Sequence, residues 1–293
     1  PSAQSIQVFG GEDGSLDSSL GVVSTPEYGR VFISIKSVSG SNLTSAEKSN
    51  LVKGLQKYNV ASITPVIVDP DTTNIIFQSV FKYNSNRTTV SADTLKTDVT
   101  KVLQTYGDTE LKDFNKPFRH SVVTGLVDDV SDAIVSNTLT ILLSKSLTPT
   151  IAKSTSYTIA YNNTLYNPHT EHNKDAGGII SSTGFKVSGD TTNVYYFDDD
   201  GAGNLRRYYL VGSTRTYVDN SAGTINYVTG IVTINGISIA SVEAVDGLAS
   251  KSIRITAIPN SMDVVPLRNQ LLELDMTNST VVAEVDTIEV SEQ

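Results

Sequence analysis

The chain has 293 residues, with 22 Lys and Arg against 31 Asp and Glu and a formal net charge of -9. This length allows two or three domains with cores of their own, and the acidity argues against nucleic-acid binding, which requires concentrated positive charge. Cysteine is absent, which excludes disulfides, thiolate metal sites and a cysteine nucleophile within this segment.

The first 26 residues are glycine- and serine-rich, with one short candidate strand around Ile6–Phe9. The chain starts at Pro1 without a methionine, so we expect a fragment or a processed product. No apolar run is long enough to cross a bilayer, and no signal-peptide pattern is present. We interpret residues 1–26 as an arm or connector to a missing N-terminal part, ordered mainly by partners.

Residues 27–148 are predicted to form an α+β domain. The run Pro26–Lys36 reads as a turn followed by a buried strand, with Phe32 and Ile33 in the core. Thr44–Glu47 has the pattern of a capping box, which predicts a helix start. The other expected elements are strands at Ile63–Val68, Ile75–Tyr83 and Ile134–Leu147, and helices at Ser91–Tyr106 and after Pro117. The order β-α-β-β-α-β indicates a ferredoxin-like sandwich.

Each predicted helix has an apolar stripe that we expect to face this core. The first stripe comprises Leu51, Val52, Leu55 and Tyr58; the second comprises Leu95, Val99, Val102, Leu103 and Tyr106; the third comprises Phe118, Val122 and Leu126. Gly107 is the expected stop of the second helix.

Residues 149–293 are predicted to form a β-rich region, a sandwich or a barrel, that ends in an acidic tail. Helical periodicity nearly vanishes after Thr148–Thr150, and short strands separated by Gly, Asn and Asp turns follow. Tyr227–Ile231 is a candidate hairpin, and Asn235-Gly236 is a strong turn signal. The predicted strands are Tyr157–Tyr161, Gly184–Val187, Val194–Phe197, Arg207–Val211, Thr224–Tyr227, Ile231–Ile234, Ile237–Val245, Ile253–Ile258, Leu271–Leu274 and Val281–Val285.

The run Asp198–Asn204 resembles a calcium loop, because hard cations favour clustered carboxylates. A twelve-residue loop starting at Asp198 would need an acidic residue where Tyr209 stands, and strands flank it instead of helices. We therefore favour an acidic turn between two strands, with Arg206 and Arg207 available to neutralise it.

The histidines offer a second set of candidates. His169 and His172 are three residues apart in a polar loop, whereas a helical zinc pair is separated by four, so we favour a solvated loop. His120 lies beside Arg119 near a helix start, where packing or a surface contact is favoured over general base catalysis, because no serine nucleophile motif accompanies it.

Glycine pairs at Gly10-Gly11 and Gly201–Gly203 lack the lysine and the strand-then-helix setting of a phosphate loop. The sequence therefore predicts no catalytic, cofactor-binding or metal-binding residue, and no enzyme activity.

Five stretches resemble the baseplate J-like proteins of contractile phage tails, in particular the ring-forming wedge proteins among them. These are Val8–Asp13, Pro26–Ile33, Val130–Leu147, Gly223–Gly230 and Ile258–Pro266. The resemblance implies a structural subunit of the baseplate wedge in the virion, assembled in the host cytoplasm. It implies an inner ring around the tail tube, contacts of the chain with itself and with other wedge subunits near tube and sheath, and no nucleic-acid or membrane partner.

A bacterial cell-surface or adhesin-type binding module is the alternative, since the second half alone fits it. The α+β first half argues against this class. A cell-wall hydrolase of the tail ranks third, because no carboxylate pair with aromatic platforms is evident in the sequence.

Overall fold

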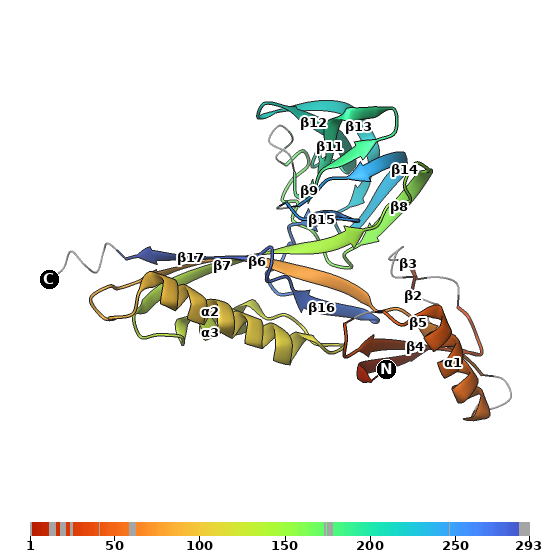
Figure 1. Ribbon diagram of the computed structural model, residues 1–293, viewed down its shortest axis with the longest axis horizontal. Coiled ribbons are helices and arrows are strands. Elements are labelled where there is room, and N and C mark those ends of the chain that lie inside the picture. Colours follow the sequence, from red (N-terminus) through yellow and green to blue (C-terminus); the bar gives the residue numbers. More distant parts are fainter. Residues whose placement is uncertain are drawn as a thin grey trace. The chain divides into compact units, whose positions relative to one another are not determined.

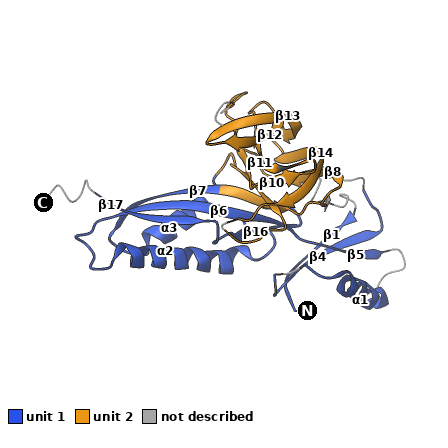
Figure 2. Cartoon of the chain, turned by 45° about the horizontal axis from the view of Figure 1, so that its top comes forward, with its two compact units in different colours: residues 1–16, 23–141, 262–293 blue, residues 17–22, 142–261 orange. Residues whose placement is uncertain are grey.

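The computed structural model describes residues 2–11, 16–17, 22–23, 26–40, 42–58, 63–172, 174, 178–245 and 247–286. The chain divides into two compact units (Figure 2). Unit 1 comprises residues 1–16, 23–141 and 262–293, and unit 2 comprises residues 17–22 and 142–261. The final segment thus belongs with the first unit, and not with the predicted β-rich region 149–293. The predicted acidic tail, from Glu289 on, lies outside the described residues.

One sheet of unit 1 has three strands, β1 (Ala3–Gly10), β4 (Arg30–Ser37) and β5 (Thr64–Val68). β1 pairs with β4 antiparallel and β4 pairs with β5 parallel. Phe9 stacks on Phe32 with ring centroids 5.5 Å apart. The start of the predicted arm is therefore a strand of this sheet. β2 (Leu16–Asp17) and β3 (Val22–Val23) are two-residue strands, and the rest of the serine-rich segment lies outside the described residues.

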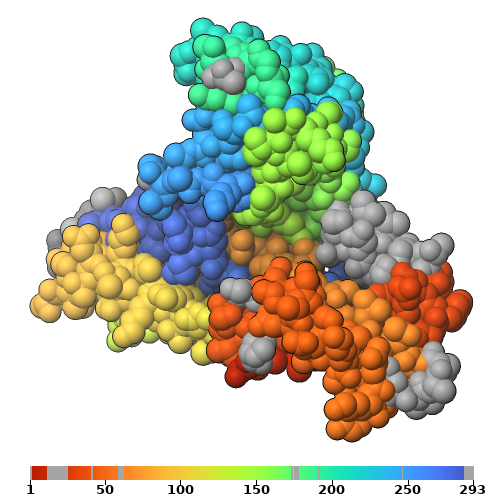
Figure 3. Space-filling model, turned by 45° about the vertical axis from the view of Figure 1, so that its right-hand side comes forward, coloured from red at the N-terminus to blue at the C-terminus, as the bar shows by residue number. Residues whose placement is uncertain are grey.

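The crossover between β4 and β5 contains helix α1 (Ser45–Leu55) and the short 3-10 turn η2 (Gln56–Tyr58). The predicted capping box is confirmed, because Thr44 accepts from the Glu47 amide while the Glu47 carboxylate accepts from the Thr44 amide. The predicted packing of its stripe is wrong. No residue of α1 is buried, and Tyr58 is 85% exposed. In the space-filling view this segment forms a lobe at the surface (Figure 3).

The second group of strands in unit 1 is organised by β6 (Asp71–Tyr83). One edge of β6 lies beside β7 (Ile134–Leu147), and the other pairs in parallel with β16 (Gln270–Leu274) and then with β17 (Thr280–Val285) (Figure 1). Helices α2 (Ala92–Tyr106) and α3 (His120–Asp128) cover one face. The core between them includes Ile75, Phe77, Phe81, Leu95, Val99, Leu103, Val123, Val127, Leu139 and Ile141.

Gly107 does not stop α2 as predicted. The chain continues through a π-helical turn, η3 (Gly107–Leu111), with Gly107 at φ -58°. A Cβ on Gly107 would lie 3.0 Å from the Leu274 side chain. The glycine leaves room for the Leu274 side chain on β16, and its backbone is not left-handed.

A ferredoxin-like sandwich is not clearly shown. Its expected strands are divided between two sheets, since β4 and β5 pair with each other and with β1, whereas β6 and β7 lie in the other group. The physical reason is that the free edge of β6 is taken by β16 and β17 from the end of the chain. The predicted domain 27–148 therefore contains two sheets.

Unit 2 confirms the predicted mainly-β character and contains a closed five-stranded barrel. Its strands are β10 (Phe185–Val187), β11 (Asp190–Asp199), β12 (Asn204–Val211), β13 (Thr214–Asn226) and β14 (Ile231–Val242). Each pairs with the next, and β10 closes the ring by pairing with both β14 and β11. β8 (Ser154–Ala160) adds to β14, while β9 (Ile180–Ser182) lies between β11 and β15 (Ile253–Ala257), which pairs with the end of β7.

Aromatic and aliphatic side chains fill the barrel, as expected for a barrel this small. Phe185 stacks on Phe197 with centroids 4.7 Å apart, and both are fully buried. The predicted hairpin before Ile231 is confirmed, with Gly230 at φ +69°. The predicted turn at Asn235-Gly236 is wrong: it lies inside β14, where the pairing with β8 shifts register between Ile234 and Ile237. The register shift marks an irregularity inside one long strand. Glycine occurs at β-bulges as well as at turns, so composition alone did not separate the two.

Phe32→Ala should destabilise the chain by about 3–5 kcal/mol, because Phe32 is 3% exposed and stacks on Phe9. Ile33→Ala is the matched control on the same strand. Ile33 is only half-buried, contrary to expectation, so its loss should be about 1–2 kcal/mol. Urea unfolding followed by circular dichroism measures both. Equal losses for the two variants would contradict the assignment of Phe32 to the core.

Candidate functional site

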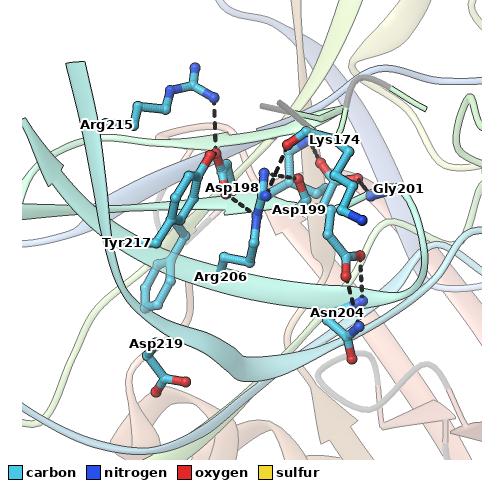
Figure 4. A network of polar contacts seen from close by, with 12 residues as sticks. Lys174, Asp198, Asp199, Gly201, Asn204, Arg206, Arg215, Tyr217 and Asp219 are labelled. Atoms are coloured by element: carbon cyan, nitrogen blue, oxygen red, sulfur yellow. Dashed lines mark hydrogen bonds and ion pairs between the residues drawn. The ribbon is translucent and has the colours of Figure 1, made fainter. Parts of the chain in front are cut away.

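The acidic run at the end of β11 is the most concentrated group of charged contacts in the described part of unit 2 (Figure 4). Asp198 lies opposite Arg206 in the β11–β12 register. Its carboxylate accepts from Arg206 Nε at 3.0 Å, from Arg215 Nη1 at 2.9 Å and from the Tyr217 hydroxyl at 2.8 Å. Three consecutive barrel strands, β11, β12 and β13, therefore meet at one carboxylate.

Burial sets the electrostatics of this cluster. The Asp198 side chain is 2% exposed and that of Arg206 is 7% exposed. Burial raises the pKa of Asp198, while the Tyr217 hydroxyl and the two guanidinium groups oppose that rise. Arg206 also donates to the Lys174 and Asp199 carbonyls, so its guanidinium is well supplied with acceptors. A buried pair of this kind is costly to break by removing one partner, because the other charge is left uncompensated.

Arg206 and Arg215 also lie over aromatic rings. The Arg206 guanidinium carbon is 4.2 Å from the Tyr217 ring centroid, and that of Arg215 is 5.0 Å from the Tyr208 centroid. Cation–π contacts of this geometry add to the ion pairs. The predicted neutralisation by Arg206 is confirmed. Arg207 does not take that role and lies over the Tyr195 ring instead.

The other two carboxylates of the run are satisfied by local donors. Asp199 is fully buried and accepts from the Ile180 amide at 2.8 Å, the Gly201 amide at 3.3 Å and the Tyr227 hydroxyl at 2.7 Å. Burial, followed by the Asp199 carboxylate, raises the pKa of Tyr227. Asp200 accepts from the amides of Ala202 and Asn204 at 2.8 and 3.0 Å.

These hydrogen bonds favour the acidic-turn interpretation over the calcium loop. The carboxylate oxygens point at amides, hydroxyls and guanidinium groups of the chain itself, which are donors that a cation would have to displace. The cluster of Asp198, Arg206, Arg215 and Tyr217, here called the clamp, joins β11, β12 and β13 to one another. Arg206 also joins it to the loop that contains Lys174.

The two loop histidines do come together. His172 Nδ1 lies 3.2 Å from His169 Nε2, and the rings meet edge to face with centroids 4.9 Å apart. The His172 ring also packs edge to face on Tyr166 at 5.3 Å. Within the described ranges, no three His, Cys, Asp or Glu side chains gather so as to hold a metal ion.

Asp263, which belongs to the last sequence segment of unit 1, contacts both Arg119 and His120. Asp263 accepts from the His120 amide at 2.8 Å and from Arg119 Nη1 at 2.9 Å, and so caps α3, whose own N-cap residue makes no side-chain cap bond. The His120 amide, together with Arg119, lowers the pKa of Asp263. His120 Nε2 donates to the Leu139 carbonyl at 2.8 Å, which fixes a packing role for the ring.

The glycine-rich stretches also have structural roles. The Gly11 carbonyl accepts from the Glu27 amide at 2.6 Å, and a Cβ on Gly11 would collide with the Glu27 carbonyl. Gly201 has φ +72° in the acidic turn.

Among the helices that the structure describes, none combines the length and the apolar character needed to span a membrane.

An open groove of about 880 Å³ runs between α2 and α3. Its lining includes four apolar or aromatic side chains and charged side chains of both signs. These are Val102, Tyr106, Val122 and Leu126, with Asp98, Lys101, Glu110, Lys116, Arg119 and Asp129. The sequence analysis assigned all four apolar or aromatic residues to the core. Tyr106 is buried as predicted, whereas Val102 and Leu126 are half-buried and Val122 is 50% exposed. On α3 the buried residues are Val123 and Val127 instead.

The first half of the chain matches models of phage baseplate structural proteins. Residues 1–68 match "Baseplate structural protein gp6, C-terminal domain I", and residues 73–146 match "Baseplate structural protein gp6, C-terminal domain III". The first match ends with β5 and the second begins within β6, where the chain passes from one sheet to the other.

A curated relative gives the same result. The chain is 28% identical over 113 residues to "Baseplate wedge protein gp6" of Enterobacteria phage T4, and this covers 39% of the chain and 17% of the T4 protein. Together these matches support a gp6-like family of baseplate wedge proteins, and the two family models lie in the first half of the chain. They carry the gp6 name, and the broader baseplate J-like name is not confirmed.

Asp198→Asn should destabilise the chain by about 3–5 kcal/mol, since it leaves the buried Arg206 without a counter-charge and turns an amide donor toward Arg215 or Tyr217. Asp200→Asn is the control: it weakens one local turn and should cost about 1 kcal/mol. Urea unfolding compares the two. Near-equal losses, or a midpoint raised by calcium in the wild type, would contradict the clamp.

Proposed function

We propose that this chain is part of a structural subunit of the baseplate wedge of a contractile phage tail, and that it has no enzymatic activity. The observation that carries the proposal is the ordered pair of gp6 matches over residues 1–68 and 73–146, supported by the T4 relative. The site geometry agrees, because the clustered charged and histidine side chains serve packing and capping.

The surface is consistent with a subunit that is covered by partners. Several large apolar side chains are exposed in the region that matches domain I, and exposed apolar surface of this kind is typical of interaction sites. They are Ile6, Val8, Tyr28, Val38, Leu51, Tyr58 and Ile63.

The location and partners follow from the same proposal. The chain lies in the virion, in the tail baseplate, after assembly in the host cytoplasm. It contributes to the inner ring that holds the wedges together around the tail tube while the sheath contracts. It contacts itself and other wedge subunits near tube and sheath, and the net charge of -9 agrees with partners other than nucleic acid.

An assembly experiment tests this proposal. The chain is added in excess to intact wedge components during baseplate assembly in vitro, and the products are viewed by negative-stain electron microscopy. Incorporation into the inner ring, or blocked ring closure, is expected, because the chain should occupy contacts that the full-length subunit normally makes. Phe32→Asp, which buries a charge in the domain I sheet, is the control and should not compete. Normal baseplates with the wild-type chain left free would contradict the proposal.

A further inference from the structure

The three histidines of the chain have different surroundings. His120 lies at the start of α3, where its Nε2 donates to the Leu139 carbonyl. His169 and His172 lie instead at the two ends of a tight turn in the loop between β8 and β9, with His172 Nδ1 3.2 Å from His169 Nε2. His169 is exposed and His172 is half-buried, so solvent reaches this pair.

The backbone of the turn holds the two histidines together. The His172 amide donates to the His169 carbonyl at 3.2 Å, which closes a four-residue turn. Glu171 has φ +63° within this turn, and its amide donates to the Gly201 carbonyl at 3.0 Å. Gly201 packs so closely on the turn that a Cβ there would lie 2.5 Å from the His172 amide nitrogen. The acidic turn of the barrel therefore positions the histidine pair.

The hydrogen bonds of the pair determine which nitrogen of each neutral ring carries the proton. His169 Nδ1 lies 3.1 Å from the Thr170 carbonyl, and a carbonyl only accepts, so this nitrogen is the protonated one. His169 Nε2 is then an acceptor, to which His172 Nδ1 donates. Histidines that bind metals almost always donate their other ring nitrogen to a carbonyl, a carboxylate or water. His169 therefore has the tautomer and the supporting hydrogen bond of a metal ligand.

The distance between the two ring nitrogens suits a shared ion. Zn²⁺ binds imidazole nitrogen at about 2.0–2.1 Å with tetrahedral angles, so two nitrogens on one ion lie about 3.3–3.4 Å apart. The observed separation is 3.2 Å. The ring centroids are 4.9 Å apart, which is shorter than for two nitrogens that face each other head-on across this distance. The nitrogens therefore approach each other at an angle, as two ligands of one ion do.

We propose that His169 and His172 bind one divalent transition-metal ion of the class that includes Zn²⁺, a role that goes beyond the proposed structural function. Imidazole suits Zn²⁺, Cu²⁺ and Ni²⁺, whereas Ca²⁺ and Mg²⁺ take oxygen ligands. His169 supplies Nε2 and His172 supplies Nδ1, whose proton moves to the other nitrogen of the same ring when the ion binds. Water fills the remaining coordination positions, because no third His, Asp or Glu joins the pair among the described residues. The spacing of three residues, which argued against a helical zinc pair, brings the two rings together in a turn.

Calorimetric titration of the metal-free 293-residue chain with ZnCl₂ tests the site. One Zn²⁺ should bind per chain, and His169→Ala or His172→Ala should weaken binding at least tenfold, because each removes one of the two protein ligands. His120→Gln is the matched control: it removes the other imidazole of the chain and should bind Zn²⁺ like wild type. Absence of saturable Zn²⁺ binding by wild type, or equal weakening by His120→Gln, would overturn the proposal.

Competition with MgCl₂ separates the site from general attraction of cations to an acidic chain of net charge -9. A tenfold excess of Mg²⁺ over Zn²⁺ should leave Zn²⁺ binding unchanged, because Mg²⁺ does not take imidazole ligands. Displacement of Zn²⁺ by Mg²⁺ would show binding to carboxylates and would overturn the assignment to the histidines.

NMR of the histidine rings gives a readout on the wild-type chain. The long-range ¹H–¹⁵N spectrum contains three imidazoles, which the single variants assign. Without metal, at about pH 8, where imidazole is neutral, His169 and His172 should both carry the proton on Nδ1. Zn²⁺ should shift the His169 Nε2 signal and convert His172 to the Nε2-protonated form, while His120 stays unchanged. Shifts of all three rings, or of none, would overturn the proposal.

A glycine variant tests whether the acidic turn positions the pair. Gly201→Ala keeps both imidazoles, but its Cβ would displace the His172 backbone, so Zn²⁺ binding should weaken several-fold. Gly212→Ala is the matched control: Gly212 has a similar φ of +63°, but nothing lies within 4 Å of a Cβ there, and the variant should bind Zn²⁺ like wild type. Unchanged affinity in Gly201→Ala, or an equal loss in Gly212→Ala, would overturn the positioning role of Gly201.

Discussion

Unit 1 depends on the pairing of β6 along both of its edges. β7 occupies one edge, and β16 and β17 occupy the other in succession, with Asp71 paired to Gln270 and Tyr83 to Val285. Parallel strands cannot be joined by a tight hairpin, so the chain must leave β6 and return by a long connection. Residues 142–261, which form most of unit 2, lie within that connection. The core positions Ile75 and Phe81 are fully buried as a result.

Part of this fold could be predicted from patterns of residues that are close in the sequence. The bounds of β7 and the capping box at Thr44 were predicted correctly, because strand composition and cap chemistry depend on neighbouring residues. The places of β16 and β17 were not predictable in the same way, since a parallel partner two hundred residues away leaves no local pattern. The stripe of α1 was interpreted as a core face, because the spacing of apolar residues predicts an amphipathic helix without showing whether that face is buried.

The charged cluster illustrates the same division. The turn and the role of Arg206 follow from residues close in sequence, on two strands that are adjacent along the chain. Arg215, Tyr217 and Tyr227 reach the carboxylates from β13 and the turn that follows it, and Asp263 caps α3 from the other end of unit 1. Contacts with another strand, or with a distant part of the same sequence, can be predicted only once the strand topology is known. The functional class came from resemblance, because the residues form structural contacts and not a catalytic pattern.

Unit 2 closes on itself at the point where the chain enters and leaves it. The last residues of β7 pair antiparallel with β15, so that Leu143 lies opposite Ala257 near the two ends of the segment. An insertion whose ends are already joined imposes little loop-closure entropy on its host, whatever its length. Such a segment is free to be shortened, enlarged or exchanged during evolution while the host sheet keeps its pairing. The two family-model matches end at residue 146 and so include only the first residues of this segment.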